Sequence, residues 1–198
     1  MSAEQGPATF LVGGALTWAP ALGHPDLLAP STLAFVRRWA EVDAAAAEQV
    51  LVTEIDPGLA DTAALTEAYA LPPAASANCV LVAGRREGDE RIAAAVVRAT
   101  TRADVNNAVK RLLDVRKASF LPMDRATAES GMEYGGITPL GLPASYRVLV
   151  DARVTVEDPD AGGDVVIGSG LRRSKLALPG ALLGQAPGVE VVEGLALA

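Results

Sequence analysis

The stretch SGMEYGGITPLG, residues 130–141, contains four glycines and almost no side chain that could act as an acid, a base or a nucleophile. Glu133 and Tyr134 are its strong polar candidates, and Thr138 is a weaker one. Glycine adopts backbone conformations that other residues avoid, and it lets a ligand approach the main chain closely. Two interpretations are therefore open: a tight turn between two elements, or a binding loop that works through its backbone N–H groups.

Side chains that usually carry nucleophilic or metal chemistry are scarce elsewhere in the chain. There is one cysteine, Cys79, and one histidine, His24. A nucleophilic cysteine needs an adjacent base, but His24 lies far away in sequence, beside a proline. Cys79 lies in an apolar stretch, so we interpret it as a small buried side chain. One cysteine and one histidine cannot build the usual zinc site without several carboxylates.

The overall charge bounds the class of partner. The formal net charge is −7, which argues against a non-specific grip on duplex DNA. This charge still allows a small basic pocket that holds one strand end. The apolar N-terminal run is interrupted by glycine and proline and lacks a positively charged flank, so we expect neither a membrane span nor a signal peptide. We expect a cytoplasmic protein.

The elements that must position the glycine stretch follow from hydrophobic periodicity and turn signals. Residues 78–84 and 91–100 are expected to pair as an antiparallel hairpin. Because most strand partners are near neighbours, the expected class is α+β with a mixed, largely antiparallel sheet. Residues 1–50 are expected to form a helical extension packed on one globular unit, residues 51–198. Helices are expected at 29–42, 56–71, 104–115 and 125–130, and further strands at 49–55, 146–154, 164–170, 174–178 and 189–194.

The order of elements from Asn78 to Asp151 resembles the YbaK/EbsC family of bacterial aminoacyl-tRNA deacylases, which are related to the editing domain of bacterial prolyl-tRNA synthetases. GMEYGGITPLG is similar to the glycine loop of that family, VLVD to its next strand and aspartate, and VRKASF to its preceding strand. The resemblance covers roughly residues 75–180. It implies a barrel-like α+β domain flanked by helices, with no metal and no cofactor.

The resemblance also implies an activity. Family members hydrolyse the ester that joins a wrong amino acid to the 3′-terminal adenosine of a tRNA, so the implied partner is the CCA end of an aminoacyl-tRNA. A monomer and a homodimer are both open. The N–H groups of Gly135, Gly136 and Ile137 would stabilise the negative charge on the carbonyl oxygen. The same loop supplies three expected substrate-binding residues: Gly131, Thr138 and Pro139.

One position departs from the family. The family carries a lysine at the start of the first hairpin strand, where it is thought to hold the terminal phosphate, and this sequence has Asn78 there. In the first alternative, Asn78 positions the substrate by hydrogen bonds. In the second, another cation, Lys117 or Arg116, reaches the same phosphate. In the third, the protein binds tRNA or a nucleotide with reduced or lost hydrolysis. We favour the first two because the glycine loop and Asp151 are intact.

Asp151 follows the apolar run RVLV. We expect its carboxylate at the floor of the pocket, where it would orient the glycine loop or bind the ammonium group of the substrate. The alternative is a carboxylate at the end of a strand that caps the next turn.

The segment VVIGSGLRR, residues 165–173, lacks the third glycine and the following helix of a dinucleotide site. We interpret it as a second loop that faces the same pocket. Its expected substrate-binding residues are Gly168, Ser169 and Gly170. Three cations lie at its end or just after it, as tRNA contacts or as an ordinary solvated charge run: Arg172, Arg173 and Lys175.

Overall fold

A computed structural model describes residues 14–198 of the chain. Its strands form a four-stranded sheet, a five-stranded sheet and a separate pair. In spatial order, the first sheet is β1 (Ala19–Pro20), β2 (Leu51–Glu54), β9 (Ser174–Pro179) and β8 (Asp164–Gly168). The second is β10 (Val189–Val192), β7 (Arg147–Asp151), β4 (Asp89–Arg98), β3 (Ala77–Arg86) and β6 (Ala118–Phe120). The pair is β11 (Ala196–Leu197) and β5 (Arg102–Ala103).

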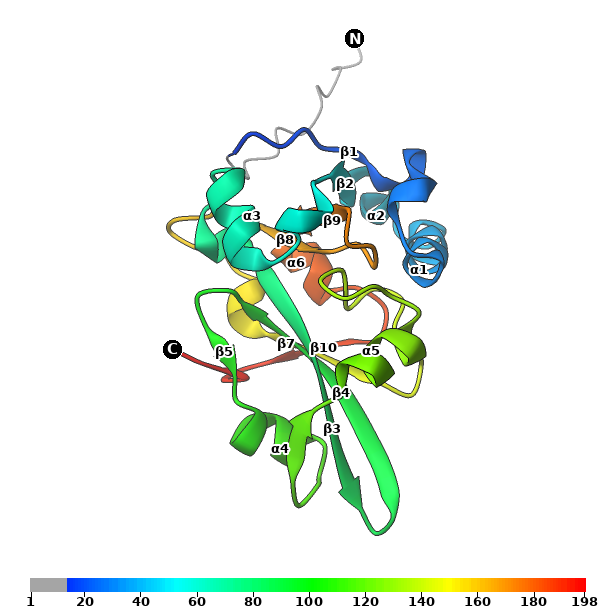
Figure 1. Cartoon of the computed structure of the whole chain (residues 1–198), viewed down its shortest axis with the longest axis vertical. Helices are drawn as coiled ribbons and strands as arrows, with labels where there is room; N and C mark the ends of the chain where they lie inside the picture. The colour runs from blue at the N-terminus through cyan, green and yellow to red at the C-terminus, as the bar shows by residue number, and fades with distance from the viewer. Residues whose placement is uncertain (1–13) are drawn as a thin grey trace.

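Strands β3 and β4 form the long hairpin that the sequence predicts (Figure 1). They pair antiparallel from Ala77, opposite Arg98, to Arg86, opposite Asp89. Strand β7 runs parallel to both β4 and β10, whereas the other strand pairs are antiparallel. The predicted α+β class with mixed, largely antiparallel sheets is confirmed.

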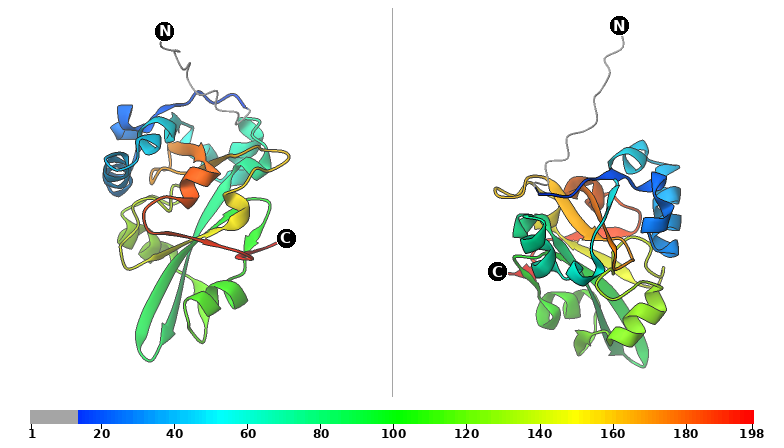
Figure 2. Two further views of the ribbon diagram at one scale, coloured as in Figure 1. Left: turned by 180° about the vertical axis from the view of Figure 1, so that it is seen from behind. Right: turned by 45° about the horizontal axis from the view of Figure 1, so that its top comes forward.

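Helices flank these sheets (Figures 1 and 2). They are α1 (Pro30–Ala40), α2 (Ala44–Gln49), α3 (Thr62–Ala68), α4 (Lys110–Leu112), α5 (Met123–Ser130) and α6 (Gly180–Gly184). Pro30 occupies the first helical position of α1, as expected, because a missing N–H costs nothing there. Within residues 14–198, no helix combines the length and the apolar character that crossing a membrane requires.

The N-terminal helices share a core with the strands. Val36 and Trp39 of α1 belong to the same buried cluster as Val52 of β2 and Leu176 of β9. Each of these four side chains is at most 2% exposed, so α1 and the β1-β2-β9-β8 sheet, whose strand β9 carries Lys175, share one buried core. Residues 1–13 of the expected extension lie outside the described residues.

The helix after Asp104 and the strand expected at 146–154 are among the elements that differ from the expectation. Asp104 caps a helix as predicted, since its carboxylate accepts the N–H of Asn107 at 3.1 Å. The first turn, Val105–Val109, is however a π-helix, and only the short α4 follows it. The strand expected to reach residue 154 ends at Asp151, where a 3₁₀ turn, Ala152–Val154, begins.

A buried arginine holds the chain that enters β3. Arg98 is 3% exposed, and its guanidinium donates to the carbonyls of Ala74, Arg153 and Val156 at 2.6–2.8 Å. Ser76, two residues after Ala74, forms an isolated parallel bridge with Val166 of β8. The start of β3 is thereby held against β8, and a pocket opens between them.

Candidate functional site

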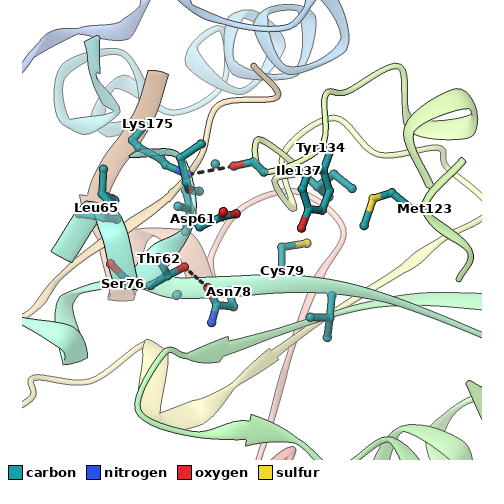
Figure 3. A pocket seen from close by; sticks show the side chains of 17 residues that line it. Asp61, Thr62, Leu65, Ser76, Asn78, Cys79, Met123, Tyr134, Ile137 and Lys175 are labelled. Carbon is teal, nitrogen blue, oxygen red and sulfur yellow. Dashed lines mark hydrogen bonds between the residues drawn. The ribbon is translucent and has the colours of Figure 1, made fainter. Parts of the chain in front are cut away.

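The pocket has a volume of about 340 Å³ (Figure 3). Its lining comes from the start of α3, the start of β3, strands β8 and β9, the first residue of α5 and the glycine loop. Residues from four stretches of the chain, 60–65, 76–80, 123–137 and 166–175, therefore meet at one place. The polar side chains that line it are Asp61, Thr62, Ser76, Asn78, Tyr134 and Lys175.

The glycine loop lies along one wall. Gly135 and Ile137 line the pocket, as does Gly168 of the second loop. The two loops are joined through the main chain: Gly170 N–H donates to Gly136 O at 2.7 Å, and Glu133 N–H donates to Gly170 O at 2.9 Å. The expected second loop thus faces the first one.

The N–H groups of the loop are not all available. Gly136 N–H donates to Glu133 O at 3.0 Å and so closes the turn of the loop itself. Gly136 is also absent from the pocket lining. Of the three predicted N–H donors, Gly135 and Ile137 line the pocket, whereas the N–H of Gly136 is used within the loop.

Close contact between the two loops explains why glycine is needed here. A Cβ atom at Gly168 would lie 2.2 Å from Gly136 O and 2.5 Å from Ile137 O. A Cβ atom at Gly136 would lie 2.6 Å from the main chain of Leu171. Gly135 has a φ of 79°, in the left-handed region that glycine adopts easily. The glycines therefore bring two stretches of backbone together at the pocket wall.

Lys175 is the buried cation of the site. It is 6% exposed, and its Nζ donates to Ala60 O at 2.8 Å and to Gly135 O at 3.0 Å. Burial lowers its pKa to about 8; the charge of Asp61 opposes this shift, and the charge of Arg172 adds to it. An ammonium group has three N–H bonds, so one more is available to a ligand beside Gly135.

Asn78 lies at the pocket, opposite the loops. Its Oδ1 accepts the hydroxyl of Thr62 at 2.7 Å, so the side chain is oriented by the first turn of α3. Ser76 lies two residues before it, 4% exposed. Within residues 14–198, the Ser76 hydroxyl has no hydrogen-bond partner, although buried hydroxyl groups normally have one. Its position in the lining makes it a candidate ligand contact.

The predicted place of Asp151 at the pocket floor is wrong. Its Oδ1 accepts the main-chain N–H of Arg153 at 3.0 Å and that residue's Nε at 2.8 Å, and its Oδ2 accepts Ala196 N–H at 2.8 Å. Burial acts to raise its pKa, but these hydrogen bonds outweigh burial, and the pKa is lowered. Asp151 therefore caps the turn after β7, the alternative that the sequence left open.

The structure also leaves Lys117 and Arg116 away from the pocket. Both are exposed, and the neighbouring Ala118 pairs with Gly84, six positions along β3 from Asn78.

Five other predicted residues support the loops without lining the cavity. Gly131 ends α5 with a φ of 67°, and Thr138 and Pro139 are buried. The hydroxyl of Ser169 forms a hydrogen bond with the hydroxyl of Ser174, and Gly170 packs on Ala29.

Sequence reasoning missed the pocket roles of Lys175 and Asp61. The sequence places Lys175 beside Arg172 and Arg173, as a tRNA contact or part of a solvated charge run, and the signal for burial is its place inside the apolar strand SKLAL. Asp61 occupies the N-cap position of α3 but makes no capping hydrogen bond, and it lines the pocket instead. Among residues 14–198, no three metal-ligating side chains gather as a metal site.

Cys79 lines the pocket, and burial raises its pKa to about 12. We therefore expect a neutral, unreactive thiol, because alkylation requires the thiolate. At pH 8 the folded protein should react with iodoacetamide roughly 100-fold more slowly than the urea-unfolded chain, as followed by intact mass. Equal rates in the two states would show that Cys79 is a reactive thiolate.

Comparisons with known proteins agree with this arrangement. The family model for the aminoacyl-tRNA editing domain matches residues 56–184. The structure of the hypothetical protein APE2540 matches with a TM-score of 0.66 at 17% identity, over 82% of this chain and 99% of that one. A candidate trans-editing enzyme for prolyl-tRNA synthetase matches with a TM-score of 0.65 at 16% identity, over 86% of this chain and 99% of that one.

Identities this low show a shared fold only. A comparison with curated proteins finds no significant match. The family model, however, covers more than half of the chain, from the start of the segment before α3 to the end of α6. It includes every wall of the pocket, and the chain therefore belongs to the aminoacyl-tRNA editing domain family.

Proposed function

We propose that the protein hydrolyses the ester between a wrongly attached amino acid and the 3′-terminal adenosine of a tRNA, after the synthetase has released that tRNA. The observation that carries this proposal is the meeting of Lys175 and the glycine loop in one pocket, with Nζ 3.0 Å from Gly135 O. Membership in the editing family supports a tRNA deacylase function. The site adds a place where negative charge is stabilised.

The reaction needs little side-chain chemistry. Water adds to the ester carbonyl carbon, the bond to the ribose oxygen breaks, that oxygen takes a proton, and the amino acid leaves as a carboxylate. Negative charge develops on the carbonyl oxygen in between, and fixed N–H donors stabilise it. Gly135 and Ile137 would contribute main-chain N–H groups. The hydroxyl of the tRNA's own ribose would help to activate water, which fits a pocket without a histidine.

We assign to Lys175 the cationic role that Asn78 cannot fill. Its free N–H would contact an anionic oxygen of the substrate, either the developing oxyanion or a phosphate. Asn78 and Ser76 would orient the substrate from the opposite wall by hydrogen bonds. This assignment replaces Lys117 and Arg116, which lie at the far end of β3.

Replacing Asn78 with lysine tests this assignment. Because Lys175 already supplies a cation, we expect Asn78→Lys to raise kcat/KM by no more than about threefold. Any larger change should be a loss, since like charges repel in a buried site. Steady-state deacylation at pH 7 measures this. A tenfold gain would mean that the wild-type site lacks its cation and that Asn78 marks a weakened enzyme.

The experiment for the function itself is a deacylation panel. The protein is incubated with tRNAs carrying different wrong amino acids on their 3′ ends, and loss of the labelled ester is followed. We expect one or a few esters to disappear much faster than in buffer. Tight binding of charged tRNA without ester loss would favour the second candidate, a binding module, whose supporting observation is Asn78 at the family's lysine position.

A further inference from the structure

An exposed aromatic side chain stands at the mouth of the pocket. Tyr134 lines the pocket and is 53% exposed, whereas the inner lining residues Leu65, Val166 and Ile167 are at most 2% exposed. Large exposed apolar groups that gather at one place mark a binding surface. Met123, 48% exposed, lines the same pocket beside Tyr134 (Figure 3).

The ring of Tyr134 is held from one side by Arg172. The guanidinium carbon lies 5.5 Å from the ring centroid, within the range of a cation–π contact. Two hydrogen bonds fix Arg172: its main-chain N–H donates to the Glu133 carboxylate at 2.6 Å, and its Nη1 donates to Tyr134 O at 3.2 Å. The ring is thus positioned before any ligand binds, and its exposure leaves the rest of its surface to a partner.

We propose that Tyr134 stacks on the purine base of the nucleotide that carries the ester, with the Met123 side chain closing the other side of that subsite. This inference rests on the proposed function and adds a recognition element to it. Tyr134 directly precedes Gly135, the loop residue at the reaction site, so a base attached to the same ribose lies within reach. The buried inner part of the pocket is left to the amino acid.

The chemistry of the subsite fits a base better than an amino acid side chain. Proteins that bind single strands stack bases on aromatic rings, often together with arginine. Such stacking works for any base, because it uses the π-face. The tRNA is too large to enter a pocket of about 340 Å³, so its terminal nucleotide must sit at the mouth, where Tyr134 and Met123 lie.

The test compares substrates with and without the base. Hydrolysis of a 3′-aminoacyl-adenosine and of the matching 3′-aminoacyl ester of ribose without a base is measured for the wild type and for Tyr134→Ala, Tyr134→Phe and Phe120→Ala. Phe120 is a matched control, an aromatic residue 63% exposed outside the pocket lining. We expect Tyr134→Ala to lower kcat/KM for the adenosine ester about tenfold, chiefly through KM, and to spare the ribose ester that lacks the base. Tyr134→Phe keeps the ring and should keep the preference for the ester that carries the base, and Phe120→Ala should behave as wild type.

Equal losses on both esters would show that Tyr134 shapes the loop, and no loss on either would show that it does not stack; each result overturns the inference. A binding titration keeps the test independent of turnover. Adenosine monophosphate should bind at least fivefold more tightly than ribose 5-phosphate, and Tyr134→Ala should remove that preference. If the wild type binds adenosine monophosphate no more tightly than ribose 5-phosphate, the inference is overturned. If that preference is present but no ester is hydrolysed, the proposed function alone is overturned.

Discussion

Replacing Lys175 with methionine is expected to lower kcat/KM for deacylation at least 100-fold at pH 7. Methionine is also long and unbranched, so it fills much of the same space, but it donates no hydrogen bond. Removing one donor to a developing oxyanion typically costs 10²- to 10³-fold in rate. The contact from Nζ to Gly135 O is lost as well, which frees the glycine loop. Single-turnover deacylation of the best substrate measures the effect.

The pH profile distinguishes a charged role from a structural one. Because the pKa of Lys175 is about 8, its ammonium is present below that pH and lost above it. Asp61, which favours the charge, and Arg172, which opposes it, are the charged groups facing it. We expect enzymatic deacylation, corrected for hydrolysis in buffer, to fall as the pH rises through about 8. The exposed Lys117→Met variant is the control and should match the wild type. A Lys175→Met enzyme with wild-type activity would contradict the assignment.

The same variant is expected to change the pH dependence of stability. The pKa of Lys175 falls from 10.5 for an ordinary lysine to about 8 in the fold, so between these values the unfolded chain binds the extra proton. The free energy of unfolding of the wild type, relative to Lys175→Met, should therefore rise by about 3 kcal/mol from pH 7 to pH 11. Urea denaturation at each pH measures it. A difference that stays constant would mean that the ammonium is solvated.

Replacing Gly168 with alanine is the second large expected effect. The new Cβ atom would lie 2.2 Å from Gly136 O and 2.5 Å from Ile137 O, and both are main-chain atoms that cannot rotate away. The two loops must separate, which weakens the hydrogen bond from Gly170 to Gly136. We expect the free energy of unfolding to fall by about 2 kcal/mol and kcat/KM to fall about 100-fold, because small misplacements of catalytic groups are costly.

Gly23→Ala provides the matched control. A Cβ atom at Gly23 meets no heavy atom within 4 Å, and its φ is not in the left-handed region. This variant should keep the stability and the activity of the wild type. If Gly168→Ala loses stability but deacylates at the wild-type rate, the position of the glycine loop does not determine the reaction rate.

Most of the framework could be predicted from the sequence, because it depends on local patterns. The β3–β4 hairpin follows from two apolar runs joined by a turn, and the Asp104 cap follows from residue type at a helix start. The glycine loop could be predicted as a binding element only through its resemblance to a family. What the pattern could not show is that Gly136 N–H is used inside the loop.

The role of each charged residue was harder to predict, because it depends on contacts between distant segments. Lys175 meets Ala60 and Gly135 from two different parts of the chain, and no local pattern encodes that meeting. Asp151 is expected at the pocket because VLVD resembles a family motif, yet the main-chain N–H of Ala196, near the C-terminus, donates to its carboxylate. The short strands β5 and β11 were missed for the same reason, since two-residue strands form only through a distant partner.

The measurement that tests the central claim most directly is the single-turnover rate of ester loss from mischarged tRNA. Three proteins are compared on the best substrate of the panel at pH 7: wild type, Lys175→Met and Gly168→Ala. The account predicts fast loss with the wild type and losses of rate of about 100-fold or more in both variants, with fold retained. Ester loss at the buffer rate for every wrong amino acid, or equal rates in all three proteins, would contradict it.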